Sequence, residues 1–151
     1  MLKAVAGQLA IFKDPAAQLQ IALAIREGTF GNDPAVLKVV AGKLAMFTDS
    51  AAQQHIALAI KEGKFGDDPE VLKAVAGQLA MFTDPTAQQD IARAIYEYKF
   101  GQMSDDVNAA VAGKVDIFTD PVAKSVIATM PTWHPVSKAL REKPLSAPKP
   151  N

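Results

Sequence analysis

The sequence predicts an all-α protein, a right-handed-type α-solenoid of about four helix-turn-helix repeats, each about 35 residues long. Two observations lead to this prediction. A Val-Ala-Gly motif returns at offsets of 35, 35 and 36 residues, which is typical of a repeat architecture. Aromatic residues make up only 7% of the chain while alanine is abundant, a balance that suits closely packed helices rather than a sheet. A compact multi-helix bundle is the alternative architecture.

The repeated motif divides the chain into four units. Val5, Val40, Val75 and Val111 begin the Val-Ala-Gly copies. A phenylalanine and an aspartate two positions later follow in each unit: Phe12 and Asp14, Phe47 and Asp49, Phe82 and Asp84, Phe118 and Asp120. The predicted helical repeat domain covers residues 1–130, with units at about 1–33, 34–68, 69–103 and 104–130. Residues 131–151 are predicted to form a C-terminal cap and a proline-rich, disordered tail.

The ends of the helices are marked by aspartate, proline and glycine. Asp33-Pro34 and Asp68-Pro69 each place an N-cap acceptor before a proline at the first helical position. The four aspartates of the repeated motif are expected to cap the second helix of each unit in the same way. In unit two, these signals predict a first helix over Pro34–Phe47 and a second over Ser50–Glu62. Gly28 and Gly63 are expected at left-handed C-caps.

The spacing of apolar residues predicts which helix faces are buried. In the first helix of unit one, two apolar stripes on opposite sides predict a helix that is covered on both faces. Glycine inside a helix costs about 1 kcal/mol relative to alanine, so its return at Gly42, Gly77 and Gly113 predicts close approach by a neighbouring backbone. The second helix shows one buried stripe, Ala17, Ile21, Ala24 and Ile25, with its other side chains expected to be exposed.

The last unit departs from the pattern. Pro131 is expected to end its second helix early, and a short helix is expected over about Pro135–Glu142. Trp133 is expected to cover the last open face of the stack, as the terminal unit of a repeat array often does.

Composition narrows the classes of function and location. Lys plus Arg and Asp plus Glu are both 16, and a balanced charge disfavours a nucleic-acid partner. The absence of cysteine excludes disulfides, thiolate metal sites and a cysteine nucleophile. No apolar run is long enough to span a membrane. The first residues repeat at 72–82, which argues against a signal peptide. A soluble, cytoplasmic location is the default, and secretion as an effector stays open.

The residues that could carry chemistry all have structural explanations. The only histidines are His55, expected on an exposed helix face, and His134, expected to pack or cap a turn. The aspartate series is explained by N-capping, and no motif for catalysis or phosphate binding occurs. We therefore predict a protein that is not an enzyme, with no catalytic, metal-binding or cofactor-binding residue and no cofactor.

Positions that differ between the copies suggest a binding surface. On the second helices these positions recur at spacings of three and four, so they share one face. They form what we call the variable surface: Leu19, Leu23, Arg26, Gln54, Leu58, Lys61, Gln89, Arg93 and Tyr96. Its leucines predict an exposed apolar area that binds a protein or peptide in a scaffolding role. The alternatives are a self-assembling array or spacer, joined through the open N-terminal repeat, and a repeat fragment of a larger secreted effector.

Overall fold

The computed structural model describes residues 7–97 and 105–142, and every regular element in these ranges is helical. The prediction of an all-α chain is confirmed for this part of the sequence. The predicted tail beyond residue 142 and the apolar residues of the first six positions lie outside the described residues.

The second helices of the predicted units are the longer ones: α2 (Pro15–Arg26), α4 (Ser50–Lys61), α6 (Pro85–Tyr96) and α8 (Pro121–Ala128). The first helices are α3 (Pro34–Gly42), α5 (Pro69–Gly77) and α7 (Asp105–Ala112). Each of these three continues as a short 3-10 helix: η2 (Leu44–Met46), η3 (Leu79–Met81) and η4 (Val115–Ile117). The remaining elements are η1 (Leu9–Ile11) and α9 (Pro135–Glu142). The bounds of α9 and the early end of α8 agree with the sequence prediction.

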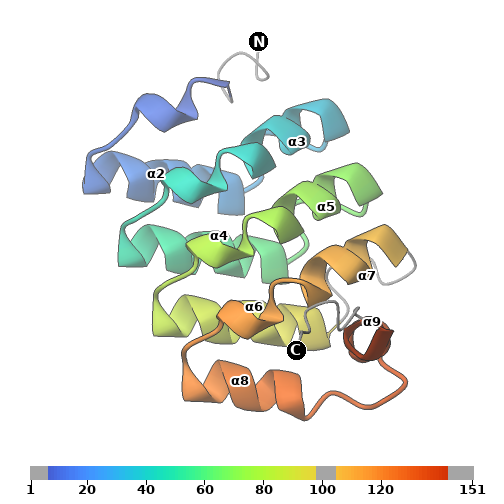
Figure 1. Cartoon of the computed structure of the whole chain (residues 1–151). Coiled ribbons are helices and arrows are strands. Elements are labelled where there is room, and N and C mark those ends of the chain that lie inside the picture. Colours follow the sequence, from blue (N-terminus) through green and yellow to red (C-terminus); the bar gives the residue numbers. More distant parts are fainter. Residues whose placement is uncertain (1–6, 98–104, 143–151) are drawn as a thin grey trace, which may run out of the picture.

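The helices lie in two layers (Figure 1). One layer holds α2, α4, α6 and α8 in sequence order, and each of these helices contacts the next. The other layer holds α3, α5, α7 and α9, again with contacts between successive members. Successive hairpins therefore pack side by side, each helix against the equivalent helix of the following unit.

The predicted aspartate N-caps are present at the starts of the helices. Asp14, Asp49, Asp84 and Asp120 each accept a hydrogen bond from the backbone N–H three residues later, at 2.9–3.1 Å. Asp33 and Asp68 accept from the second residue after them, both at 2.9 Å. Each bond satisfies a backbone donor that the helix itself leaves unpaired, and a cap of this kind contributes about 1 kcal/mol.

Two of the helices, α2 and α4, are followed by a glycine in the left-handed backbone conformation. Gly28 has φ 79° and Gly63 has φ 77°, so the predicted C-caps are confirmed. After α2, the N–H of Thr29 donates to the carbonyl of Ala24 at 2.9 Å, and Gly28 donates to Ile25 at 3.1 Å. This pair of bonds is the Schellman arrangement, which satisfies carbonyls at the helix end.

The first helix of each unit differs from its prediction. A continuous helix over Pro34–Phe47 is expected, but α3 ends at Gly42 and the chain continues as η2. Gly42 and Gly77 are exposed, and a Cβ atom on either would meet no neighbour within 4 Å. The predictions of close backbone approach and of a helix covered on both faces are therefore wrong. Gly42 instead lies where the backbone hydrogen bonds change from the α-helical to the 3-10 pattern, and glycine weakens the α-helix at that point. The first bond of the 3-10 pattern runs from the N–H of Lys43 to the carbonyl oxygen of Val40, at 2.9 Å.

The two kinds of glycine are expected to respond oppositely to alanine. Gly42→Ala is expected to raise the free energy of unfolding by about 0.4–1 kcal/mol, because φ is not positive there and the added methyl group meets nothing. Gly63→Ala is expected to lower it by about 1–2 kcal/mol, because an L side chain strains a left-handed residue. Urea unfolding of both variants measures the difference, and a destabilised Gly42→Ala would contradict the assignment of this glycine to a helix end.

The second helices are buried more widely than the single predicted stripe. Gln18, Gln53 and Gln88 recur at intervals of 35 residues and are at most 4% exposed. Gln53 donates through Nε2 to the carbonyl of Phe47 at 3.0 Å, and its Oε1 accepts from Thr83 N–H and Asp84 N–H, both at 3.0 Å.

Gln18 and Gln88 make the equivalent contacts: each donates to the phenylalanine carbonyl of its own unit and accepts from two backbone N–H groups of the following unit. Each glutamine therefore joins the end of one first helix to the N-terminus of the second helix in the next unit. The prediction that this part of the second helix is exposed is wrong, because the neighbouring hairpin covers it.

The C-terminal cap is formed by His134 rather than by Trp133. The Nε2 atom of His134 lies 3.1 Å from the carbonyl oxygen of Ile95 and 3.2 Å from that of Tyr96, and its Nδ1 accepts from Val136 N–H at 3.1 Å. Because Nδ1 is the acceptor, Nε2 carries the proton and donates to the last carbonyls of α6. His134 is 1% exposed, so its predicted packing and capping role is confirmed. Trp133 is 70% exposed, so its predicted covering role is wrong.

Candidate functional site

The nine residues of the variable surface lie on three neighbouring helices. Leu19, Leu23 and Arg26 belong to α2, the next three to α4, and Gln89, Arg93 and Tyr96 to α6. Because α4 contacts both α2 and α6, the surface is continuous from helix to helix. Eight of the nine residues are half-buried, and Tyr96 is 39% exposed.

The leucines of the variable surface are less exposed than the sequence predicts. Leu19, Leu23 and Leu58 are all half-buried rather than exposed. The helices of this layer pack against one another, and alanines of α4 such as Ala52 and Ala59 are fully buried. Small side chains let helix axes approach closely, so a leucine at the rim is partly covered by the next helix.

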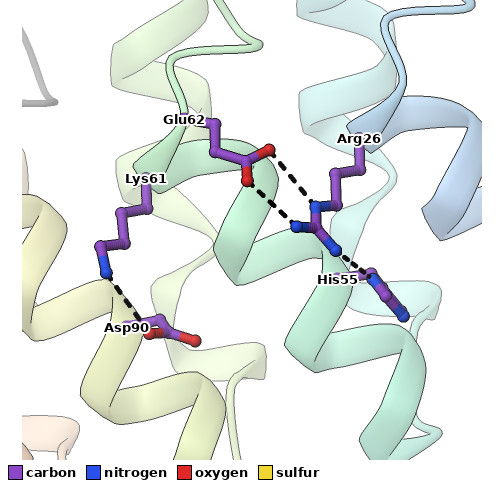
Figure 2. A network of polar contacts seen from close by, with 5 residues as sticks. All are labelled: Arg26, His55, Lys61, Glu62 and Asp90. Atoms are coloured by element: carbon purple, nitrogen blue, oxygen red, sulfur yellow. Dashed lines mark hydrogen bonds and ion pairs between the residues drawn. The ribbon is translucent and has the colours of Figure 1, made fainter.

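A polar network connects α2 to α4 on this surface (Figure 2). Arg26 donates to Glu62 through two nitrogens, at 3.3 Å from Nε and 3.1 Å from a terminal nitrogen. Its other terminal nitrogen lies 3.1 Å from Nδ1 of His55. The hydrogen bond from Arg26 lowers the pKa of Glu62, and the same bond raises the pKa of Arg26. Because Arg26 can only donate, His55 accepts through an unprotonated Nδ1.

A second network connects α4 to α6. The carboxylate of Asp90 is buried, with 8% of the residue exposed, and Lys61 Nζ lies 4.0 Å from its Oδ1 (Figure 2). Arg93, one turn further along α6, lies 3.8 Å from the same oxygen. Burial raises the pKa of Asp90, although the charges of Lys61 and Arg93 act in the opposite direction.

The two networks use equivalent positions in successive units. Arg26 reaches His55, and Lys61, which is 35 residues after Arg26, reaches Asp90, which is 35 residues after His55. His55 is predicted to lie on an exposed helix face, but it is half-buried and contacts Arg26. At both boundaries, therefore, the residue near the end of one second helix contacts a side chain on the second helix of the next unit.

Other members of the variable surface also have partners within the chain. Gln54 donates to Oδ2 of Asp84, the N-cap of α6, at 3.1 Å. Three carboxylates outside the variable surface also lie at helix starts: Asp68 caps α5, and Asp105 and Asp106 lie in the first turn of α7. A carboxylate near a helix N-terminus is stabilised by the helix dipole.

Because the carboxyl group of Asp90 is buried, we expect it to make the free energy of unfolding depend on pH. A raised pKa means that folded Asp90 takes up a proton more readily than the unfolded chain does. Its contribution to stability is therefore largest at low pH and is lost as the pH rises through the raised value. Asp90→Asn is expected to leave the stability unchanged or higher at neutral pH and to reduce its dependence on pH, as measured by urea unfolding from about pH 4 to about pH 8.

Glu62 supplies the matched control. Its lowered pKa contributes stability above its ordinary pKa, and that contribution is lost as the pH falls through the lowered value. Glu62→Gln is therefore expected to reduce stability at neutral pH. A marked loss of stability at neutral pH in Asp90→Asn would show that its ion pairs outweigh the cost of burying the carboxylate.

Comparisons of the chain with models of protein families, with curated proteins and with solved structures found no match. In the part of the chain that the structure describes, no three His, Asp or Glu side chains lie close enough together to hold a metal ion. No helix of residues 7–97 and 105–142 is both long and apolar enough to cross a membrane.

Proposed function

We propose that this chain is a right-handed-type α-solenoid module that binds a protein or peptide along the variable surface, without catalysis. The solenoid arrangement is favoured over a compact bundle by contacts that run from each helix to its equivalent in the next unit. The three buried glutamines favour it too, because each makes the same connection between consecutive units. A stack of this kind presents one long side of the layer as an extended binding surface.

The observation that carries the binding proposal is the pairing of the charged groups with one another. Arg26 is held by Glu62 and His55, and Lys61 and Arg93 are held by Asp90. Side chains that are already ordered lose less conformational entropy when a partner binds. The variable surface holds three cations, and the carboxylates that contact its residues are those of Glu62, Asp84 and Asp90, of which Asp90 is buried. A partner segment with acidic side chains fits this balance of charge.

Apolar groups on the same surface would provide the rest of the contact area. Leu23 and Leu58 lie half-buried on adjacent helices, and Tyr96, at the end of α6, is 39% exposed. Tyrosine and arginine are enriched at protein interfaces because they combine apolar area with hydrogen bonding. We therefore expect a segment in which acidic and apolar residues are interspersed.

The proposal is tested by selecting binders for the full chain from a displayed library of random peptides. The selected peptides are expected to be acidic and apolar, and Arg93→Ala with Tyr96→Ala is expected to weaken their binding about tenfold or more. Lys73→Ala, an exposed change on α5 in the other layer, is the control and should leave the affinity unchanged. Peptides that bind the double variant as tightly as the wild type, or a selection without specific binders, would overturn the proposal.

A further inference from the structure

The first described unit has an apolar face that is deeply buried in every later unit. Phe12 is 40% exposed, whereas the equivalent residues Phe47, Phe82 and Phe118 are 1–2% exposed. Ile11, beside it, is 65% exposed, while Met46 and Met81 at the equivalent positions are partly buried against the core.

Helix α2 shows the same difference. Ala17, Ile21 and Ala24 are half-buried, but their equivalents in α4 and α6 are fully buried. The equivalent residues are Ala52, Ile56 and Ala59 in α4, and Ala87, Ile91 and Ala94 in α6. We refer to Ile11, Phe12, Ala17, Ile21 and Ala24 as the N-terminal face. Within residues 7–97 and 105–142, nothing covers this face as α2 covers α4.

The opposite end of the molecule is not built to receive the N-terminal face. At each internal boundary, a glutamine accepts from the two backbone N–H groups that precede the next second helix. The equivalent position in α8 is Lys124, which is exposed and has no acceptor oxygen. Ser125 and Ala128, next to it on α8, are also exposed. Head-to-tail stacking of two copies would therefore lack the contact that joins every internal pair of units.

We propose that the N-terminal faces of two copies pack against each other about a two-fold axis and form a closed dimer. An interface of this kind uses the same surface on both subunits and ends growth at two copies. The chain has zero formal net charge, so no overall repulsion opposes the association.

The charges at the two ends of α2 suit this symmetry. Lys13 and Glu27 are both exposed and lie seven positions before and after Gln20 in the sequence. A two-fold axis near Gln20 would set the two copies of α2 antiparallel, so that Lys13 of each copy lies near Glu27 of the other. Two identical Lys13–Glu27 ion pairs would then flank the apolar centre of the interface.

The test is the mass of the full chain in solution, measured by sedimentation velocity at increasing concentration. We expect the mass to move from monomer to dimer without larger species. Ile11→Ser with Phe12→Ser is expected to weaken the dimer at least tenfold, since the loss of apolar contact area is repeated in both copies. Circular dichroism verifies that this variant stays folded. Val122→Ser, a change at a 45% exposed position on α8, is the control and should not affect association.

A charge exchange tests the symmetry itself. Lys13→Glu is expected to weaken association about tenfold, because it places two glutamates together twice in the dimer. Adding Glu27→Lys to the same chain should restore the affinity. A chain that stays monomeric, a chain that grows beyond dimers, or a dimer that the N-terminal variants leave intact would overturn the proposal.

Discussion

Replacing Gln53 with alanine is expected to lower the free energy of unfolding by about 2–4 kcal/mol, because it leaves backbone groups unpaired where water has little access. Gln53 is 2% exposed and bonds to the carbonyl of Phe47 and to the N–H groups of Thr83 and Asp84. For a chain of 151 residues the expected fall in Tm is about 6–12 °C. Thermal unfolding followed by circular dichroism measures it.

Two further variants separate the hydrogen bonds from simple loss of volume. Gln53→Met keeps the side chain long but removes its amide, so a loss close to that of Gln53→Ala would assign the effect to hydrogen bonding. Gln54→Ala removes a single bond, to the half-buried Asp84, and is expected to cost only about 0.5–1.5 kcal/mol. Equal losses in Gln53→Ala and Gln54→Ala would contradict the connecting role of the buried glutamine.

His134→Ala is expected to produce the second large effect, a loss of about 2–4 kcal/mol from the C-terminal part of the molecule. The substitution removes the donor to the carbonyls of Ile95 and Tyr96 and the acceptor for Val136 N–H. It also opens a cavity at a side chain that is 1% exposed. Hydrogen exchange should show loss of protection first in α9 and at the end of α6.

His55→Ala is the matched control for this change. His55 is half-buried and makes one bond, to Arg26, which keeps its two bonds to Glu62. Its removal is expected to cost less than about 1 kcal/mol. Unchanged protection of α9 in His134→Ala would contradict the assignment of His134 as the side chain that holds α9 in place.

The variable surface shows how much of a candidate site can be predicted from the sequence. Its residues were located on the correct helices, because spacings of three and four place side chains on one side of any α-helix. Their burial and partners were not predicted, since the contact of Arg26 with His55 spans 29 residues of sequence. Such a contact depends on how far one hairpin slides and tilts against the next, which periodicity along a single helix does not specify.

The local elements can be predicted from the sequence alone, because the residues that start and end each helix lie within a few positions of one another. Asp49 caps α4 through the N–H three residues later, and Gly63 ends it because glycine accepts a positive φ without strain. Which helix faces pack together depends on the arrangement of whole hairpins and is seen only in the structure. Gly42 was predicted to be enclosed and is exposed, and Gln53 was predicted to be exposed and is enclosed. Burial is a property of the neighbouring chain segment, and its position depends on the packing of whole hairpins.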